Sequence, residues 1–171
     1  MNFKAHVSVG IAGGYILYGL TKSFPVFTFP DAELIAPIGC VIGSVIPDID
    51  SPNSRVGKAL KPISKTIEIL SKPFHKTEEN HRGIFHDLGL AIIFAVLSYF
   101  YFPAFFGFFL GVTSHLILDA MNPSGVPFLL FKKVHLLPYN VKLYSGSSGA
   151  TALSFLIATL MIGGYIMLYK I

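Results

Sequence analysis

The stretch that decides the fold is LGLAIIFAVLSYFYFPAFFGFFLGVTSHLILDAM, Leu88–Met121. Its first 27 residues, Leu88–Ser114, contain no Lys, Arg, Asp, Glu or His. As one helix the whole stretch would be about 50 Å long, which overshoots a bilayer core of ~30 Å. Proline disfavours helix in the residue before it, so Phe102-Pro103 predicts a bend between two short helices.

The composition of the chain is that of a membrane protein. Hydrophobic residues make up 53% of the 171 residues and charged residues 13%, whereas a soluble domain has about 25% charged residues. Three further apolar stretches are Val7–Leu20, Leu34–Ile46 and Ala152–Tyr169. We therefore expect an all-α, integral-membrane bundle of about five short helices, folded as one domain over residues 1–171. Whether the first two stretches cross the bilayer stays open, because a crossing takes roughly 20 helical residues.

Small residues at helical spacing favour close packing of these helices. Three pairs have GxxxG spacing, which lets helix backbones approach in lipid: Gly10/Gly14, Gly39/Gly43 and Gly107/Gly111. Chance is the alternative, because the chain has 16 glycines, but three pairs on three different segments favour a compact bundle. The single cysteine, Cys40, excludes an internal disulfide.

The longest polar linker, Pro47–Asp87, contains seven Lys or Arg residues. Within it, apolar residues of Ser54–Leu70 recur every three to four positions, which predicts an amphipathic helix on the membrane surface. In the five-helix topology every Lys and Arg except Lys22 and Lys170 falls on the side of this linker. Positive residues mark the cytoplasmic side, so we expect a multi-pass protein of the inner (plasma) membrane with this side in the cytoplasm.

Ionisable residues beside apolar helices are costly and are therefore candidates for function. Here they are His6, Asp48, Asp50, His81, His86, Asp87, His115 and Asp119. If the chain bends at Pro103, they all fall at helix ends on one side of the bundle. One continuous helix would instead hold His86 and His115 about 40 Å apart. The bend thus predicts a single His/Asp cluster facing the cytoplasm.

The spacing of these residues is compatible with metal binding. His115 and Asp119 lie four apart, so they share a helix face and can bind one ion, although a hydrogen bond along the helix is the alternative. Asp48 and Asp50 repel each other unless cations compensate, although two solvated acids at a helix end would also explain them. Imidazole and carboxylate together suit zinc, manganese or iron(II).

The motif HRGIFHD, residues 81–87, adds His81 from a loop and His86 from a first helical turn. Asp87 either orients a histidine or, as we favour, stabilises the start of the next helix. Arg82 can hold a phosphate oxygen of a substrate, or it is an interfacial charge that reaches to the headgroups.

At these residues the sequence resembles the YdjM-like, LexA-regulated inner-membrane proteins, a family assigned to metal-dependent hydrolases. The matching elements are His6, GSVIPDIDSP, HRGIFHD and SHLILDAMNPSG, from His6 to Gly125. That family is distantly similar to zinc-dependent phospholipases C and single-strand nucleases, which are all-helical enzymes with zinc ions held by His and Asp. The resemblance implies that zinc is bound and that its ligands or their close partners are His6, Asp48, Asp50, His81, His86, His115 and Asp119. The soluble enzymes have further His and Glu ligands toward the end of their sequences, and this chain has no equivalent of them. Two ions are therefore expected rather than three.

Together these observations predict a metal-dependent hydrolase of phosphoester bonds, with Asp50 or Asp48 bridging the ions or accepting the proton. A site at the membrane surface favours a phospholipid or lipid-linked substrate over nucleic acid, because the basic linker suits anionic headgroups. A transporter of metal ions or protons is a second hypothesis, although transporters bind near the bilayer midplane. A third is a non-catalytic scaffold with a closed metal site.

Overall fold

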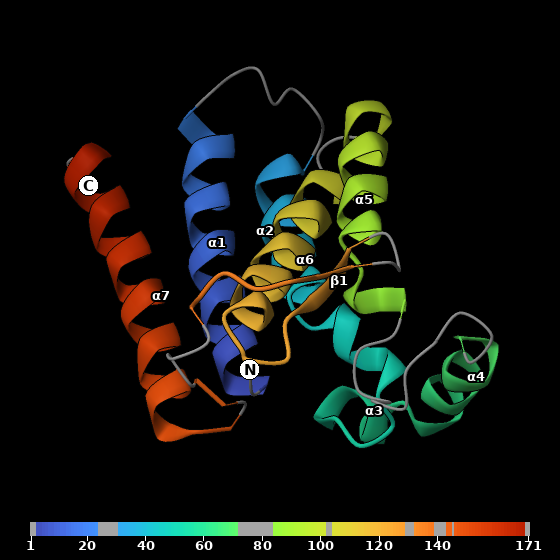
Figure 1. Ribbon diagram of the computed structural model, residues 1–171. Helices are drawn as coiled ribbons and strands as arrows, with labels where there is room; N and C mark the ends of the chain where they lie inside the picture. The colour runs from blue at the N-terminus through green and yellow to red at the C-terminus, as the bar shows by residue number, and fades with distance from the viewer. Residues whose placement is uncertain are drawn as a thin grey trace.

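The computed structural model describes residues 3–23, 31–71, 84–101, 104–128, 132–138, 143–144 and 146–169. His81 and Arg82 lie outside these described residues. Five long helices form the bundle in Figure 1: α1 (Phe3–Ser23), α2 (Ala32–Gly43), α5 (Leu88–Phe100), α6 (Ala104–Ala120) and α7 (Ser148–Tyr169). The helical class is thus confirmed, and each predicted apolar stretch forms a helix.

The centre of the bundle is α2, which packs between α1 and α6. On the outside, α7 packs against α1 and α5 packs against α6. The bend predicted near Pro103 is confirmed, because α5 ends at Phe100 and α6 begins at Ala104. The two helices lie side by side, with the ring of Phe94 stacked 5.7 Å from that of Phe108. His86, before α5, and His115, in α6, therefore return to the same end of the bundle.

Glycines make the close crossings at α2 possible. A Cβ on Gly43 would lie 2.6 Å from the carbonyl oxygen of Phe108 in α6, and a Cβ on Gly111 would lie against the carbonyl of Cys40. A Cβ on Gly14 would approach the carbonyl of Pro37 to 3.1 Å. Because backbone atoms cannot move aside as a flexible side chain can, these positions need glycine. At least one glycine of each GxxxG pair thus lies at a close helix contact.

The linker after α2 folds at one end of the bundle. It forms the 3-10 helix η1 (Ile46–Asp50), helix α3 (Arg55–Ala59) and helix α4 (Lys61–Ser71), and the 3-10 helix η3 (Ile84–His86) leads into α5. The single surface helix predicted over residues 54–70 is therefore wrong in detail, since α3 ends before Leu60 and α4 starts anew. Pro62 explains the break, because proline lacks an N–H and suits only the first turn of a helix.

A two-stranded hairpin was not predicted. Strand β1 (Val126–Phe128) pairs antiparallel with β2 (Lys132–Val134), with Val126 opposite Val134. Val126 is buried against Ala91, Val112 and Leu116, so the hairpin covers one side of the α5–α6 pair. Strands of three residues are too short to show an alternating pattern in the sequence.

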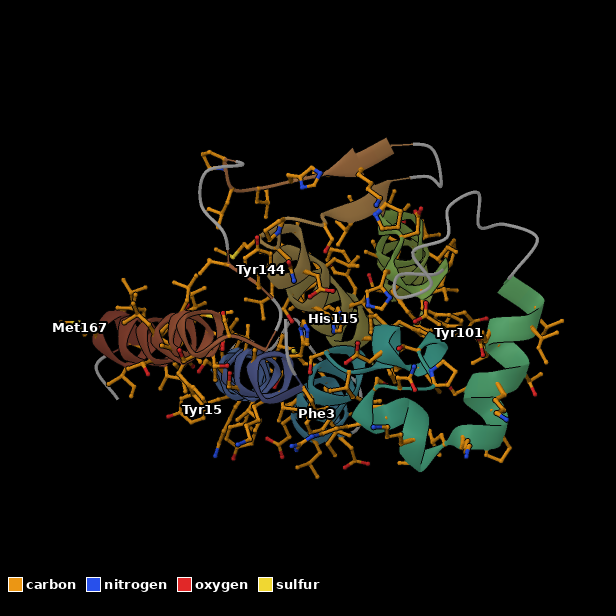
Figure 2. All side chains as sticks on the ribbon, turned by 60° about the horizontal axis from the view of Figure 1, so that its bottom comes forward. Phe3, Tyr15, Tyr101, His115, Tyr144 and Met167 are labelled. Carbon is orange, nitrogen blue, oxygen red and sulfur yellow. The ribbon has the colours of Figure 1, made fainter. Side chains whose placement is uncertain are left out.

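Large apolar side chains point outward on all five long helices. Examples that are more than half exposed are Ile11, Ile38, Ile93, Val96, Leu160 and Met167. Figure 2 shows such side chains standing around the rim of the bundle. Within the described part of the chain, Ser148–Tyr169 alone is both long and apolar enough to cross a bilayer, and α2, α5 and α6 are apolar but shorter.

Candidate metal centre

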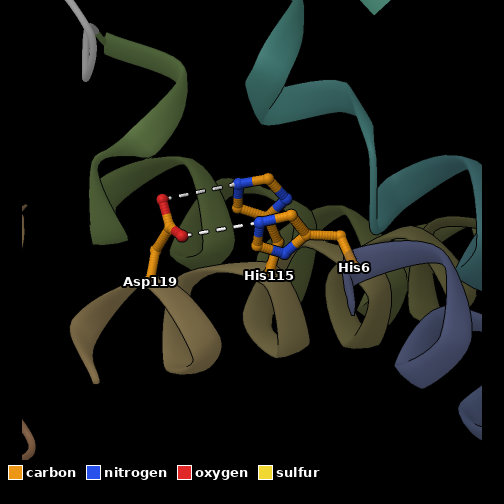
Figure 3. A group of neighbouring side chains, drawn as sticks. All are labelled: His6, His115 and Asp119. Atoms are coloured by element: carbon orange, nitrogen blue, oxygen red, sulfur yellow. Dashed lines mark ion pairs between the residues drawn. The ribbon is translucent and has the colours of Figure 1, made fainter. Parts of the chain in front are cut away.

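The site is built first from α6, whose last turns carry His115 and Asp119. Residues four apart lie on one face of a helix, and both side chains turn into the bundle, where they are buried. Nε2 of His115 lies 3.9 Å from Oδ2 of Asp119 (Figure 3). The two residues therefore face a common point, as their spacing predicts.

His6 reaches the same point from the first turns of α1. Its ring stacks on that of His115, with centroids 3.6 Å apart and planes 11° from parallel. Its Nε2 lies 3.4 Å from Oδ1 of Asp119 (Figure 3). The carboxylate of Asp119 thus turns one oxygen to His6 and the other to His115.

The two acids of the motif PDID point to different sides because they belong to a 3-10 helix. Such a helix has three residues per turn, so residues two apart are about 120° apart around its axis. Oδ1 of Asp48 lies 3.7 Å from Nε2 of His86 and 3.9 Å from Nε2 of His115. Both oxygens of Asp50 instead lie 3.4 Å from Nδ1 of His86, on the far side of that ring. Asp48 therefore faces the cluster, and Asp50 holds His86 from behind.

Two hydrogen bonds to backbone atoms hold His115 and the start of α5 in place. Nδ1 of His115 donates a hydrogen bond of 2.7 Å to the carbonyl of Ser44, the residue that ends α2. Asp87 caps α5 by accepting a hydrogen bond of 2.6 Å from the N–H of Gly89, which agrees with the favoured interpretation. Sequence reasoning did not identify Ser44, because it acts through its carbonyl and every residue has one.

These contacts leave an excess of hydrogen-bond acceptors at one point. The proton of His115 is on Nδ1, so its Nε2 carries a lone pair, and this lone pair faces Nε2 of His86 at 3.3 Å. A neutral His86 that donates to Asp50 would present a second lone pair. The carboxylates of Asp48 and Asp119 face the same point. Either a metal ion or a proton on Nε2 of His86 satisfies these acceptors, so the residues could hold a cation.

The distances suit a divalent metal ion. We call the inner position the point between Asp48 Oδ1, His86 Nε2, His115 Nε2 and Asp119 Oδ2. The two histidine nitrogens lie 3.3 Å from each other and 3.7–3.9 Å from each of the two carboxylate oxygens. Ligands of a tetrahedral ion at ~2.0–2.2 Å lie about 3.3–3.6 Å from one another. The ligand atoms of Asp48, His86 and His115 therefore suit zinc, and Asp119 would complete the set.

A second point, which we call the outer position, lies between His6 Nε2 and Asp119 Oδ1. The ligand atoms of His6, His115 and Asp119 fall within 4.8 Å of one another, as do those of Asp48, His86 and His115. Nδ1 of His6 is buried and has no hydrogen-bond partner among the described residues. The outer position is thus less firmly built than the inner one.

The carboxylates beside His86 favour its charged form. Burial lowers the pKa of His86, but its bonds to Asp48 and Asp50 outweigh this and raise the pKa to about 9. Burial raises the pKa of Asp48, but the hydrogen bond to His86 and the neighbouring imidazoles outweigh this and lower the pKa below its ordinary value. A charged His86 is therefore held between the carboxylates of Asp48 and Asp50.

Comparison with known proteins places the chain in a family. The model of the YdjM inner membrane protein family matches residues 1–170. The chain belongs to the YdjM inner membrane protein family. The resemblance indicated by the four motifs is therefore confirmed, and with it the membrane location.

Two relatives illustrate the similarity. The inner membrane protein YdjM of Escherichia coli is 36% identical over 115 residues, which are 61% of this chain and 53% of that protein. The chain thus matches only about half the length of that relative. The protein YvsG of Bacillus subtilis is 32% identical over 132 residues, which are 75% of this chain and 72% of YvsG. No solved structure matches the chain.

The structure brings together six of the predicted site residues: His6, Asp48, Asp50, His86, His115 and Asp119. They come from α1, η1, η3 and α6, at one end of the bundle. His81 and Arg82, outside the described residues, stay predictions. The sequence offered Asp48 or Asp50 as the bridging carboxylate, whereas in the structure Asp119 is the carboxylate that faces both positions.

Proposed function

We propose that this member of the YdjM family is a multi-pass inner-membrane hydrolase of phosphoester bonds, with the His/Asp cluster as its active site. The observation that carries the proposal is the convergence of four acceptor atoms on the inner position, at the end of an apolar bundle. Such a site binds a divalent cation, and phosphate esters are substrates on which divalent cations act directly.

The proposed site holds two ions, with zinc as the first choice and manganese or iron(II) as alternatives. The residues that would hold the inner ion are Asp48, His86, His115 and Asp119. His6 would hold the outer ion together with the second oxygen of Asp119. A divalent ion supplies Lewis acidity there, which lets water attack an ester near neutral pH.

The protein residues have separate roles in this proposal. The side chain of Asp48 is 19% exposed, whereas those of His86, His115 and Asp119 are at most 5% exposed. Substrate therefore approaches past Asp48, which is placed to accept a proton. Asp50 has a 2% exposed side chain behind His86, so its proposed role is to orient that ring and increase its basicity.

We propose a phosphate-bearing lipid or lipid-linked molecule as the substrate. The cluster lies at one end of helices whose sides carry exposed apolar residues, which supports a position near the lipid headgroups. An apolar groove of about 510 Å³ is lined by Leu88, Val96 and Phe109, among others, and Leu88 follows His86 by two residues. The groove offers an apolar surface to a hydrocarbon chain. A nucleic acid has no hydrocarbon chain to occupy this groove.

The membrane topology of the proposal follows from the helix ends. Among the described helices, α7 is long and apolar enough to cross the bilayer, and α2, α5 and α6 are apolar but shorter. If all five long helices cross, the cluster and most Lys and Arg residues share one side, which by the positive-inside rule is the cytoplasmic side. The multi-pass topology can be tested by labelling cysteines introduced at Lys58 and Lys22, which should lie on opposite sides.

The experiment is a hydrolysis assay on protein purified in mild detergent. Substrates are a soluble phosphomonoester, a soluble phosphodiester, phosphatidic acid and phosphatidylglycerol. We expect turnover of at least one ester that chelation abolishes and zinc restores. The variant Asp48→Asn should lose about 100-fold or more of this activity while retaining the helical circular dichroism of the wild type. Protein fully loaded with metal that cleaves none of these esters would overturn the proposal and favour a structural metal.

A further inference from the structure

Helix α4 lies at the periphery of the molecule, at the same end as the His/Asp cluster. Figures 1 and 2 both show it outside the five-helix bundle, beyond η1 and α3. Its main contacts are with these two short helices. The position of α4 therefore depends on η1, and η1 carries Asp48 and Asp50.

One face of α4 is apolar and uncovered. Ile63, Ile67 and Leu70 recur every three to four residues, so they share a face of the helix. Ile63 is 51% exposed and Leu70 is 67% exposed. In a protein of the inner membrane, an amphipathic helix beside the ends of the bundle meets the headgroup layer of the bilayer.

The charges around this face identify the kind of lipid. Arg55 and Lys58 in α3 and Lys61 and Lys65 in α4 are exposed and basic, and Glu68 is the one acidic residue of these two helices. A strongly basic, amphipathic surface favours anionic headgroups over zwitterionic ones. A partner protein would fit here only if it presented an anionic surface beside the apolar bundle. An anionic membrane meets this condition directly.

Two tight contacts connect α4 to the site. Ser64 is fully buried on the side of α4 that faces Gly57, where a Cβ would lie 2.9 Å from Ser64 Oγ. Ser54, which caps α3, donates a hydrogen bond of 2.7 Å to the carbonyl of Asp48 and accepts one from the N–H of Gly57. These contacts connect α4, through Gly57 and Ser54, to the backbone of Asp48.

We propose that α4 lies in the headgroup layer bound to anionic phospholipid, and that this contact holds η1, with Asp48, in its active position. The placement of α4 stands on the exposed apolar face and the charges alone. The dependence of activity on anionic lipid rests on the proposed function. The site would then work fully only when the helix is docked on an anionic membrane.

Placement is tested with the full chain in nanodiscs of phosphatidylcholine mixed with phosphatidylglycerol. An environment-sensitive fluorophore is attached at Ile63→Cys, and Lys65→Cys on the polar face serves as the matched control. We expect spin-labelled lipid to quench the label at position 63 several-fold more than the label at position 65. Equal quenching of both labels by a water-soluble quencher would overturn the placement, whatever the hydrolysis assay shows.

Coupling is tested by activity in nanodiscs of phosphatidylcholine alone and of the phosphatidylglycerol mixture. We expect wild-type activity to be several-fold higher in the mixture. The double variant Lys61→Gln/Lys65→Gln should lose that increase, because its affinity for the anionic surface falls by roughly tenfold or more. Its activity on a soluble ester in detergent should equal that of the wild type.

Equal activity of the wild type in both lipids would overturn the coupling. If no ester is cleaved in any medium, the proposed function fails, and the quenching result still decides where α4 lies.

Discussion

Nδ1 of His115 donates a 2.7 Å hydrogen bond to the carbonyl of Ser44. This bond joins α6 to the end of α2, and it directs Nε2 of His115 toward Asp48, His86 and Asp119. The same contact therefore serves the helix packing and the metal centre. A substitution that keeps the hydrogen bond to Ser44 but removes Nε2 would therefore separate the effect on folding from the effect on metal binding.

The substitution His115→Asn is such a change. The amide nitrogen of asparagine can take the place of Nδ1 and donate to Ser44, but no atom replaces Nε2. We expect metal affinity to fall at least 100-fold, with a thermal unfolding midpoint of the metal-free protein close to that of the wild type. The control is His135→Asn, a histidine outside the cluster, which should bind metal normally. Wild-type affinity in His115→Asn would show that this residue is no ligand.

Asp50 is expected to act on metal binding through His86. Replacing it by asparagine keeps an oxygen near Nδ1 but removes the negative charge that strengthens the ring as a ligand. We expect Asp50→Asn to bind zinc about 10–100-fold more weakly. Asp87→Asn is the matched control, because asparagine also caps helices and Asp87 faces the start of α5. Equal losses in both variants would mean that general disturbance of this segment, rather than orientation of His86, weakens the site.

Metal binding should release a proton from His86. Burial lowers the pKa of this imidazole, but Asp48 and Asp50 raise it to about 9, so it is charged at neutral pH. Zinc needs the neutral ring, so affinity should rise up to about tenfold per pH unit until about pH 9. Titration calorimetry at pH 7 in buffers of different ionisation enthalpy should report about one proton released by this group. Affinity that is constant from pH 7 to 9 would contradict this.

The metal-free protein should show the opposite dependence on pH. The folded pKa of His86 lies above its ordinary value of 6.5, so the stabilisation it provides is complete below about 6.5. It is lost as the pH rises through about 9. Thermal unfolding of the chelated protein should therefore occur at lower temperature at pH 9 than at pH 7. This difference should shrink in His86→Gln, which has no such proton.

The helix crossing at α2 makes a prediction about stability. A Cβ on Gly111 would lie 2.7 Å from the backbone nitrogen of Ser44, whereas a Cβ on Gly163 would meet no described atom within 4 Å. Alanine is preferred to glycine in a helix by about 1 kcal/mol, so Gly163→Ala should be neutral or stabilising. Gly111→Ala should cost about 1–3 kcal/mol because packed backbones must move apart. Unfolding in mixed detergent micelles measures both, and equal stability of the two variants would contradict the packing argument.

The sequence predicted the helical bundle well because its signals are local. Pro103 and the apolar run around it indicate the bend, and the ends of the runs locate His6, His86 and His115 on one side. The hairpin at Val126–Phe128 was missed, because three residues carry no periodicity. The break at Leu60 was missed because the apolar spacing continues across it.

The sequence was enough to predict which residues form the site, but not what each residue does in it. Counting helix ends shows that Asp48, Asp50 and Asp119 are near one another, and it says nothing about which oxygen faces which nitrogen. That depends on the 3-10 geometry of η1, which separates Asp48 from Asp50, and on the α1–α6 packing that brings His6 to Asp119. The carbonyl of Ser44 could not be singled out at all.

The most direct test of the account is the metal content of the purified protein after reconstitution with zinc and removal of free ions. Elemental analysis by mass spectrometry should give about two zinc ions per chain for the wild type. For His6→Ala the content should fall to about one, because the inner position keeps all four of its ligands. Wild-type protein with no bound zinc, manganese or iron, or equal metal content in wild type, His6→Ala and His115→Asn, would contradict it.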